Sequence, residues 1–365
     1  MPLNEQRKYM KSRLWGRMFL RVFSWIYGGA ARLRSTAYAL GMLPTMRLPV
    51  RIVCIGNLTT GGTGKTTAVL LAVEELLERK HKVAVLSRGY QRKKTSEGVV
   101  VLLDSRETGW EETGDEPWMM HKILEGRDVP VLVSPDRIKS GRTALKYYAP
   151  QILLLDDGFQ HQRLRRDADI VLINALDPFG GGRMLPDGNL REPMSALRRA
   201  HLVVLTHADR VPAERLEEIE REVKQYGKSR LRLARAVHKP DYVFDLKRNQ
   251  HHKLSHLNGK RVACFSAIGD PRPFEDELRR LGAHLEQVWR FPDHHPFTEQ
   301  ELRSIENVRN GIPVVTTLKD FPRLGGNWRE ILSGEVLALT VKMEITEGRE
   351  HWEEALLHAG SRKLS

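Results

Sequence analysis

Short apolar runs, separated by polar and glycine-containing segments, recur along the middle of the chain. They predict strands at 51–55, 83–86, 99–103, 131–133, 151–157, 170–173 and 202–205. A continuous Val, Ile and Leu run is typical of a strand that is buried on both faces of a parallel sheet. Helical patterns alternate with several of these runs, most clearly over residues 68–80. The pattern therefore predicts an α/β fold, a doubly wound parallel sheet covering residues 50–235.

A second set of strand-like runs begins near residue 260. Strands are predicted at 260–267, 288–291 and 313–317, with a helix over 274–281. Strand, helix and strand in this order are typical of a smaller Rossmann-like half. The polar segment 238–250 is predicted to connect the two halves. We expect three regions: 1–49, 50–240 and 241–365.

The N-terminal region has its own pattern, in which basic and apolar residues alternate. Apolar residues at helical spacing predict an amphipathic helix: Trp15, Met18, Phe19, Val22 and Ile26. The longest uncharged run, Val22 to Ala31, has ten residues and is too short to span a bilayer. Such a helix suits an anionic membrane surface. It is equally compatible with packing on the protein's own core.

Composition narrows the class of protein. The chain is 41% hydrophobic, which argues against disorder and low complexity. Its net charge of +13 favours an anionic partner, namely nucleic acid, nucleotide or phospholipid. Cys54 and Cys264 lie in apolar runs without zinc-site spacing, which favours buried, reduced thiols in a cytosolic protein. No apolar run reaches the length of a spanning helix, and no secretion signal is recognised.

A glycine-rich segment follows the first predicted strand and precedes a predicted helix. It reads GNLTTGGTGKTT over residues 56–67. Strand, glycine-rich turn and helix form the context of a phosphate-binding loop, or P-loop. Its nucleotide-binding residues would be Gly61, Gly62, Thr63, Gly64, Lys65, Thr66 and Thr67. Lys65 would reach the β- and γ-phosphates, and the Thr66 hydroxyl would ligate Mg²⁺.

The loop departs from the common G-x-x-x-x-G-K-[ST] pattern, because Thr59 stands where the first glycine is expected. Residues 60–66 instead match the variant K-G-G-x-G-K-T, with Thr60 in place of the first lysine. The alternative is a glycine-rich turn in which GKT occurs by chance.

Two carboxylates, Asp156 and Asp157, end the apolar run that begins at Gln151. Acids at the carboxyl end of a parallel strand lie where α/β sheets bind ligands. We expect one of them to hold Mg²⁺, directly or through water. A simple Asp-Asp turn is the alternative.

Six stretches together resemble one family. DDGFQH at 156–161 and the loop at 56–67 are similar to signatures of the tetraacyldisaccharide 4′-kinases, the lipid A 4′-kinases. Four more agree in order: SRGY at 87–90, GDEP at 114–117, LPDGNLREP at 185–193 and FPDHHPF at 291–297. Any one is weak, but six in order, from about residue 50 to 325, are highly specific.

The resemblance implies a P-loop kinase core, a smaller Rossmann-like C-terminal domain and a basic amphipathic N-terminus. It implies transfer of the ATP γ-phosphate, with Mg²⁺, to the 4′-hydroxyl of a tetraacyl glucosamine disaccharide 1-phosphate. The product would be the bis-phosphorylated lipid A precursor. The expected location is the cytoplasmic face of the bacterial inner membrane, as a peripheral protein.

The resemblance also implies roles for individual residues. Asp115 matches the family's catalytic aspartate, and His294 or His295, with a slight preference for His294, matches its partner. Such a pair can orient a sugar hydroxyl and take its proton. Asp156 and Asp157 are the metal-binding end of their strand, together with Thr66. Substrate-binding residues would be Arg88, Gln160, Arg191 and Glu192.

Each of these roles has a plainer alternative. GDEP can be a helix N-cap formed by the Asp115 side chain, and Arg191 can be an ordinary surface cation. The histidines near Asp293 could suggest a zinc site, but their spacing fits none.

The placement of GDEP in the first half and Asp-His-His in the second predicts a cleft between domains. We expect its closure to bring acid and histidine together. The sequence departs from the family pattern at two places. Leu318 replaces an acid in T-E-K-D, and the segment 187–189 differs in a loop that could influence which acceptor is chosen.

The competing class is a regulatory or metal-chaperone P-loop GTPase. Residues 206–209, Thr-His-Ala-Asp, resemble the guanine-reading N-K-x-D, but His207 replaces the lysine and Thr206 the asparagine. This favours ATP. A nucleic-acid-binding ATPase is suggested by charge alone, and clustering of the basic residues with Trp and Phe fits lipid better. No nucleic-acid partner is expected. No NAD is expected either, because G-x-G-x-x-G is missing.

Overall fold

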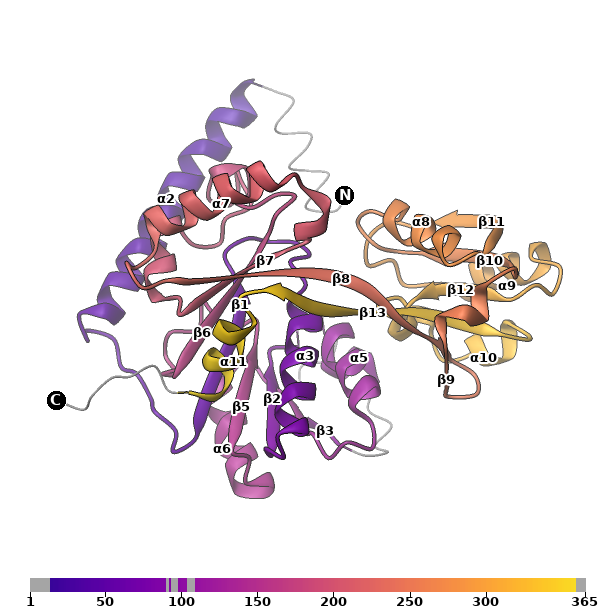
Figure 1. Ribbon diagram of the computed structural model, residues 1–365, viewed down its shortest axis with the longest axis horizontal. Coiled ribbons are helices and arrows are strands. Elements are labelled where there is room, and N and C mark those ends of the chain that lie inside the picture. The colour runs from indigo at the N-terminus through magenta and orange to yellow at the C-terminus, as the bar shows by residue number, and fades with distance from the viewer. Residues whose placement is uncertain (1–13, 90–91, 93–97, 104–108, 359–365) are drawn as a thin grey trace. The chain divides into compact units, whose positions relative to one another are not determined.

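The fold is described from a computed structural model, which defines residues 14–89, 92, 98–103 and 109–358 (Figure 1). The chain forms two compact units. Unit 1 contains the described parts of Met1–Arg88, Ser134–His238 and Met343–Ser365. Unit 2 contains those of Gly89–Val133 and Lys239–Lys342. Tyr90 of the SRGY stretch and the basic residues before Leu14 lie outside the described residues.

The strands occur where the apolar runs predict them, with additions in the second half of the chain. Their bounds are β1 Arg51–Asn57, β2 Val83–Ser87, β3 Val100–Leu102, β4 Val131–Val133, β5 Ile152–Asp156, β6 Ala168–Asn174, β7 Leu202–Thr206, β8 Arg232–Asp245, β9 Gln250–His252, β10 Arg261–Ser266, β11 His284–Arg290, β12 Val314–Thr317 and β13 Val336–Glu347.

Helices alternate with most of these strands. The α-helices are α2 Leu14–Ala39, α3 Lys65–Glu78, α4 Trp110–Thr113, α5 Asp115–Leu124, α6 Arg137–Tyr148, α7 Ala213–Tyr226, α8 Arg272–Arg280, α9 Glu299–Val308, α10 Trp328–Ile331 and α11 Arg349–Leu357. Short 3₁₀ helices cover Gly180–Gly182, Met194–Arg199, Ala208–Arg210, Leu254–Leu257 and Phe321–Leu324.

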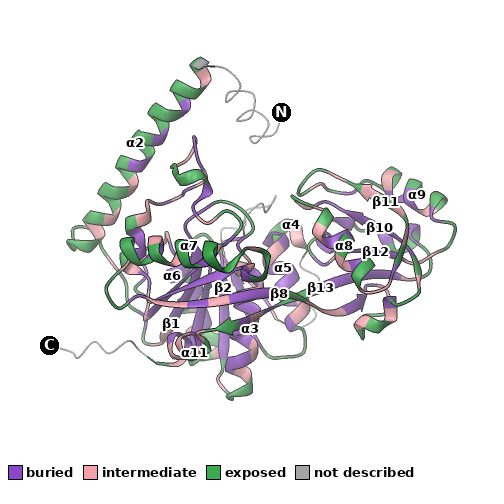
Figure 2. Cartoon of the chain, turned by 45° about the horizontal axis from the view of Figure 1, so that its top comes forward, coloured by how far each residue is buried: buried purple, intermediate pink, exposed green. Residues whose placement is uncertain are grey.

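The sheet of unit 1 has the strand order β8-β7-β6-β1-β5-β2, and neighbouring strands are parallel. β1 and β5 are buried along nearly their whole length (Figure 2), as their continuous apolar runs predict. α3 packs on β1, β5 and β2, while α11 packs on β6 and β7. The predicted doubly wound parallel sheet is confirmed for these six strands, whereas β3 and β4, predicted as part of it, pair antiparallel and belong to unit 2. Its carboxyl edge carries the phosphate loop after β1 and the carboxylates at the end of β5.

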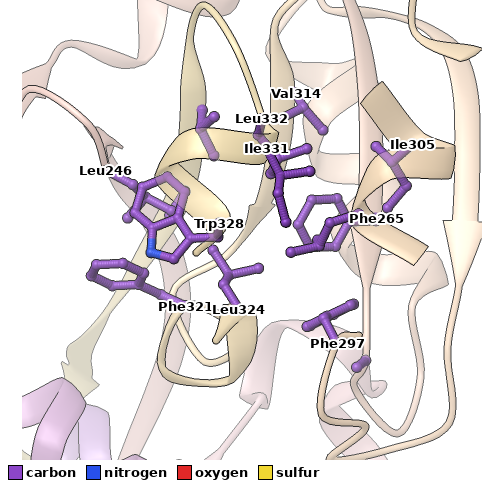
Figure 3. Packing of buried hydrophobic residues seen from close by; sticks show 14 of the residues in the cluster. Leu246, Phe265, Phe297, Ile305, Val314, Phe321, Leu324, Trp328, Ile331 and Leu332 are labelled. Carbon is purple, nitrogen blue, oxygen red and sulfur yellow. The ribbon is translucent and has the colours of Figure 1, made fainter. Parts of the chain in front are cut away.

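In unit 2, β11, β10, β12 and β13 are neighbours and form a parallel part of the sheet. One face of this part packs on a core of aromatic and aliphatic side chains, including Phe265, Phe297, Phe321 and Trp328 (Figure 3). The Trp118 ring of α5 meets the Phe321 ring edge-on at 5.0 Å, which attaches α5 to this core. The predicted Rossmann-like domain is therefore present, with helices α8 and α9 between its strands.

The structure differs from the predicted domain ranges. Residues 238–250 are not a polar connector, because β8 continues through them to Asp245. The adjacent side chains of Val243 and Phe244 are both buried, in two different core clusters of unit 2, as expected for successive residues of a strand covered on both faces. Residues 89–133 belong to unit 2, and the chain returns to unit 1 after Lys342. The contiguous ranges 50–240 and 241–365 therefore do not coincide with the compact units.

The predicted N-terminal helix is present as α2, and its apolar stripe is exposed (Figure 2). Trp15 is 85% exposed and Trp25 is 81% exposed, while Leu20 and Ser24 form a narrow buried line. The interpretation in which this stripe packs on the protein's own core is thus wrong for the described residues. Among those residues, we find no helix with the length and apolar character that crossing a bilayer requires.

Candidate active site

The phosphate loop connects the end of β1 to the first turn of α3 in unit 1. Gly64 immediately precedes the helix in the left-handed conformation, with φ of 82°, and Gly61 has φ of 120°. A Cβ built on Gly61 or Gly62 meets no atom within 4 Å, so open space lies beside their backbone. A Cβ on Gly64 would lie 2.5 Å from the His238 ring, so this position must remain glycine.

Side chains at the ends of β1 and β7 hold the loop in place by hydrogen bonds. The buried Thr206 hydroxyl donates a hydrogen bond to the carbonyl of Thr63 at 3.1 Å, and the Asn57 amide donates to the Thr63 hydroxyl at 3.0 Å. The first turn of α3 contains no acidic residue. The positive end of the helix dipole is therefore uncompensated, as a phosphate-binding loop requires. These features fit the triphosphate of ATP.

The two carboxylates after β5 have different surroundings. Asp156 is buried and accepts a hydrogen bond from the Ser87 hydroxyl at 3.0 Å. Asp157 has φ of 52°, and its two oxygens accept hydrogen bonds from Arg191 at 2.9 and 2.5 Å. Asp156 is thus the more suitable ligand for a cation, whereas Asp157 is neutralised by an arginine.

Oxygen donors on adjacent elements suit magnesium. β1 and β5 are paired, with Ile55 beside Asp156, and Thr66 lies in the first turn of α3. A hydroxyl and a carboxylate, completed by phosphate oxygens and water, form a typical Mg²⁺ site. The described residues contain no group of three or more His, Cys, Asp or Glu side chains arranged for a metal ion. The zinc alternative therefore has no support among them.

Three of the four predicted substrate-binding residues, Gln160, Arg191 and Glu192, lie on two loops of unit 1. Arg191 bridges Asp157 and the Asn57 side-chain oxygen, while the Gln160 amide donates to the Asn57 carbonyl at 2.9 Å. Glu192 is buried and accepts hydrogen bonds from Arg199 at 2.5 Å and Gln162 at 3.4 Å. Arg88 is exposed at the end of β2. Arg191 is therefore not a simple surface cation.

Helix α2 contacts the same loops. Ser24 donates to the carbonyl of Met184 at 2.8 Å, and Arg34 donates to the carbonyl of Gln160 at 2.8 Å. The Tyr27 hydroxyl donates to the carbonyl of Arg191 at 3.2 Å. The helix with the exposed apolar stripe is thus attached directly to the backbone of both predicted substrate loops.

In unit 2, Asp115 and His294 are in contact. Asp115 is the first residue of α5, and its Oδ2 lies 3.3 Å from Nδ1 of His294. The same oxygen accepts a hydrogen bond from Nε of Arg323 at 3.0 Å. The Arg323 guanidinium is buried, and it also donates to the carbonyl of Ala267 and to Asp320. The carboxylate is therefore held between a fixed cation and a half-exposed imidazole.

These contacts shift both pKa values. Burial alone would raise the pKa of Asp115, but the hydrogen bond with His294 and the positive charge of Arg323 outweigh it and lower that pKa. The hydrogen bond with Asp115 raises the pKa of His294, against the opposing effect of burial. Near neutral pH, Asp115 is ionised and His294 is more readily protonated than a free histidine.

Three of the sequence interpretations change here. Asp115 and His294 belong to the same unit and are already in contact, so closure between two domains is not needed to join them. GDEP is not an Asp cap, because Gly114 is the N-cap and no side chain caps α5. His295 lies 3.0 Å from Glu301 instead of Asp115.

Sequence reasoning missed Arg323 and Ser87 as partners of the predicted acids. Ser87 begins the SRGY stretch, but nothing in that stretch or around Arg323 indicates which acid it contacts, and each becomes a neighbour only through the fold. Leu318, which replaces an acid in the family pattern, is buried in the core of unit 2. Asp320 of the same stretch holds the Arg323 guanidinium.

Comparisons with known proteins agree with this geometry. Residues 16–360 match the family described as tetraacyldisaccharide-1-P 4′-kinase. A tetraacyldisaccharide 4′-kinase of Elusimicrobium minutum is 43% identical over 351 residues, covering 96% of this chain and 93% of that protein. The namesake from Aquifex aeolicus is 34% identical over 316 residues, covering 85% of this chain and 90% of that protein.

A solved structure is also similar over nearly the whole chain. It is the "apo" form of LpxK from Aquifex aeolicus in complex with ATP, with a TM-score of 0.75 and 32% identity. The alignment covers 93% of this chain and 98% of that one. This chain therefore belongs to the tetraacyldisaccharide 4′-kinase family.

Proposed function

We propose that this chain transfers the γ-phosphoryl group of ATP to the 4′-hydroxyl of a tetraacyl glucosamine disaccharide 1-phosphate. A bond forms between the sugar oxygen and the γ-phosphorus, the bond to the β,γ-bridging oxygen breaks, and ADP leaves. The observation that carries this proposal is the family match over residues 16–360. Transfer of label from γ-labelled ATP to the lipid acceptor tests it.

We assign the nucleotide to the loop from Gly61 to Thr67. Its backbone and the N-terminus of α3 attract the phosphates, and the Lys65 ammonium neutralises charge on the transferring group. Thr66 and Asp156 would hold Mg²⁺, which supplies further charge neutralisation at the phosphates when bound. Asp157, engaged by Arg191, is assigned to orienting that arginine.

We assign proton transfer to Asp115. A sugar hydroxyl is a weak nucleophile, so a nearby base must orient it and accept its proton as the new P–O bond forms. His294 and Arg323 hold the Asp115 carboxylate ionised and fix its direction. His294 is half-exposed, so its imidazole is accessible to an acceptor.

The pH dependence of activity follows from these pKa shifts. The pKa of Asp115 is lowered, so its protonation should not limit activity near neutral pH. In His294→Ala the hydrogen bond and the charge of His294 are both lost while the carboxylate stays buried, so the pKa of Asp115 rises. The acid limb of kcat/KM should therefore move to higher pH, as measured by a pH–rate profile. An acid limb that stays in place would contradict the pairing.

We assign the acceptor's anionic and polar groups to Arg88, Gln160, Arg191 and Glu192. Arg88 is exposed and can meet the 1-phosphate. Arg191, Gln160 and Asn57 form one hydrogen-bonded group. Glu192 accepts a hydrogen bond from Arg199. The Arg199 guanidinium also lies over the Phe159 ring, 4.4 Å from its centroid.

We further propose that α2 binds the anionic surface of the bilayer that supplies the acylated acceptor. Its exposed Trp15, Met18, Trp25 and Ile26 suit the interfacial region, and Arg17 and Arg21 suit lipid phosphates. Because ATP is a cytoplasmic substrate, we place the enzyme on the cytoplasmic face of the inner membrane. The contacts of α2 with the loops of Gln160 and Arg191 deliver the acceptor beside the phosphate loop of unit 1.

Charge neutralisation on α2 should weaken membrane binding. Each basic side chain near an anionic surface contributes about 1 kcal/mol. The double variant Arg17→Gln, Arg21→Gln should therefore bind anionic vesicles about 30-fold more weakly in a sedimentation assay. Binding to zwitterionic vesicles should not change. The control is Arg215→Gln with Arg221→Gln on α7, and equal losses in both pairs would refute the assignment.

The regulatory GTPase alternative is not favoured. The family match extends over both units, whereas the GTPase resemblance rested on the loop and on residues 206–209. Thr206 and His207 replace the asparagine and lysine that would read guanine.

A further inference from the structure

Two histidine rings stack beside the phosphate loop in unit 1. His207 directly follows β7, and His238 lies on β8, the neighbouring parallel strand. Their ring centroids are 4.5 Å apart and their planes differ by 26°. The parallel strands bring both rings to the carboxyl edge of the sheet, where nucleotides bind. We call His207 and His238 the imidazole pair.

The imidazole pair is in direct contact with the loop. Nε2 of His238 lies 2.9 Å from the Thr67 hydroxyl, which in turn donates to the carbonyl of Gly64 at 2.8 Å. The residue before His207, Thr206, holds the carbonyl of Thr63. Both rings are only partly buried, so each retains accessible surface.

The covalent structure of a nucleotide gives a reason for aromatic rings beside the phosphate loop. The loop takes the phosphates, and the base is joined through the ribose to the α-phosphate. A planar ring close to the loop can therefore stack on the base while the loop holds the triphosphate. Imidazole stacking discriminates little among bases, because every base has a π-face. The pair would add affinity for nucleotides over bare polyphosphates.

Resting on the proposed ATP-dependent function, we propose that His207, supported by His238, forms the stacking platform for the adenine base of ATP. The residues 206–209 thus retain the position of a base-reading motif with different chemistry. Thr206 fastens the loop, and His207 supplies a ring instead of a lysine chain. His238 is a positioning residue, since its ring stacks on that of His207 and contacts the Thr67 hydroxyl of the loop.

A purely structural role is the alternative, in which the rings only brace the loop. The two roles differ in the part of the ligand that is affected. A platform contributes to binding of ATP but not of inorganic triphosphate. A brace contributes to both, because both use the same loop.

The experiment measures dissociation constants by calorimetry for Mg²⁺ with ATP and for Mg²⁺ with inorganic triphosphate. The variant is His207→Asn, because asparagine tolerates the left-handed backbone at His207, where φ is 58°. The matched control is His252→Asn, which breaks a different stacked histidine pair in unit 2, at 4.2 Å from His256.

We expect His207→Asn to bind ATP about tenfold more weakly. Its triphosphate affinity should be unchanged, and the ATP affinity of His252→Asn should remain near the wild-type value. Equal losses for ATP and triphosphate, or no loss for either, would each overturn the platform. A wild-type protein that binds no ATP would instead overturn the proposed function.

Discussion

Lys65→Ala is expected to lower the rate of phosphoryl transfer about 10³-fold. Lys65 is the first residue of α3, directly after Gly64, and we assign its ammonium to the β- and γ-phosphates. Charge builds up on the phosphoryl oxygens and the leaving oxygen as transfer proceeds. In the alanine variant only the loop backbone and the metal remain to stabilise that charge. The decrease in rate should therefore be mainly in kcat.

The measurement is steady-state kinetics at saturating ATP, with thermal unfolding as a check on folding. Lys224→Met on α7 is the control, because it removes a lysine far along the chain from the loop. Lys65 is only partly buried at the surface of the loop, so the variant should unfold near the wild-type temperature. A Lys65→Ala protein with normal kcat would show that the loop does not hold the reacting phosphates.

Asp115→Asn is expected to lower kcat about 10³-fold, the range of a general base. Asparagine keeps the shape of the side chain but cannot accept the proton of the sugar hydroxyl. It also leaves Arg323 with less compensation, although Asp320 and the carbonyl of Ala267 remain as partners. The stability cost should therefore stay below the about 3–5 kcal/mol expected when a lone buried pair is broken.

ATP affinity separates the chemical effect from an unfolding effect. The P-loop belongs to unit 1, so a folded Asp115→Asn protein should bind ATP as the wild type does. Glu116→Gln, at the next position in the first turn of α5, is the matched control and should retain activity. Normal kcat in Asp115→Asn would refute the role of the base.

Local patterns predicted the parts of the fold that depend on neighbours in sequence. The phosphate loop could be predicted because its strand, glycines and helix are contiguous over residues 51–78. The strand that ends in Asp156 could be predicted from its apolar run and its final carboxylates. The family resemblance assigned Asp115 and the histidines to one site, although nothing in the sequence between them indicates that they lie close together in the fold.

The composition of the two units could not be predicted in this way. Residues 89–133 join unit 2 through long-range packing, such as Trp118 on Phe321. The C-terminal helix α11 returns to unit 1, where the Trp352 indole donates to the buried Glu75 carboxylate at 3.1 Å. Partners separated by hundreds of residues leave no periodic signal in either segment.

The choice between His294 and His295 also required the fold. His294 has φ of 61°, and its amide donates to the carbonyl of Ala267, which turns the ring toward Asp115. The His295 ring is stacked on Phe291 and bonded to Glu301, the residue that completes the capping box of α9. Adjacent identical residues thus have different partners for reasons that lie outside the motif.

The central claim is tested most directly by phosphate transfer in detergent micelles. Wild-type protein and Lys65→Ala are incubated with γ-labelled ATP, Mg²⁺ and tetraacyldisaccharide 1-phosphate, and the lipid is separated and its label located. We predict that wild type alone forms a lipid labelled at the 4′-position. Hydrolysis of ATP or GTP by the wild type with an unlabelled lipid would contradict the account and favour a GTPase-like activity instead.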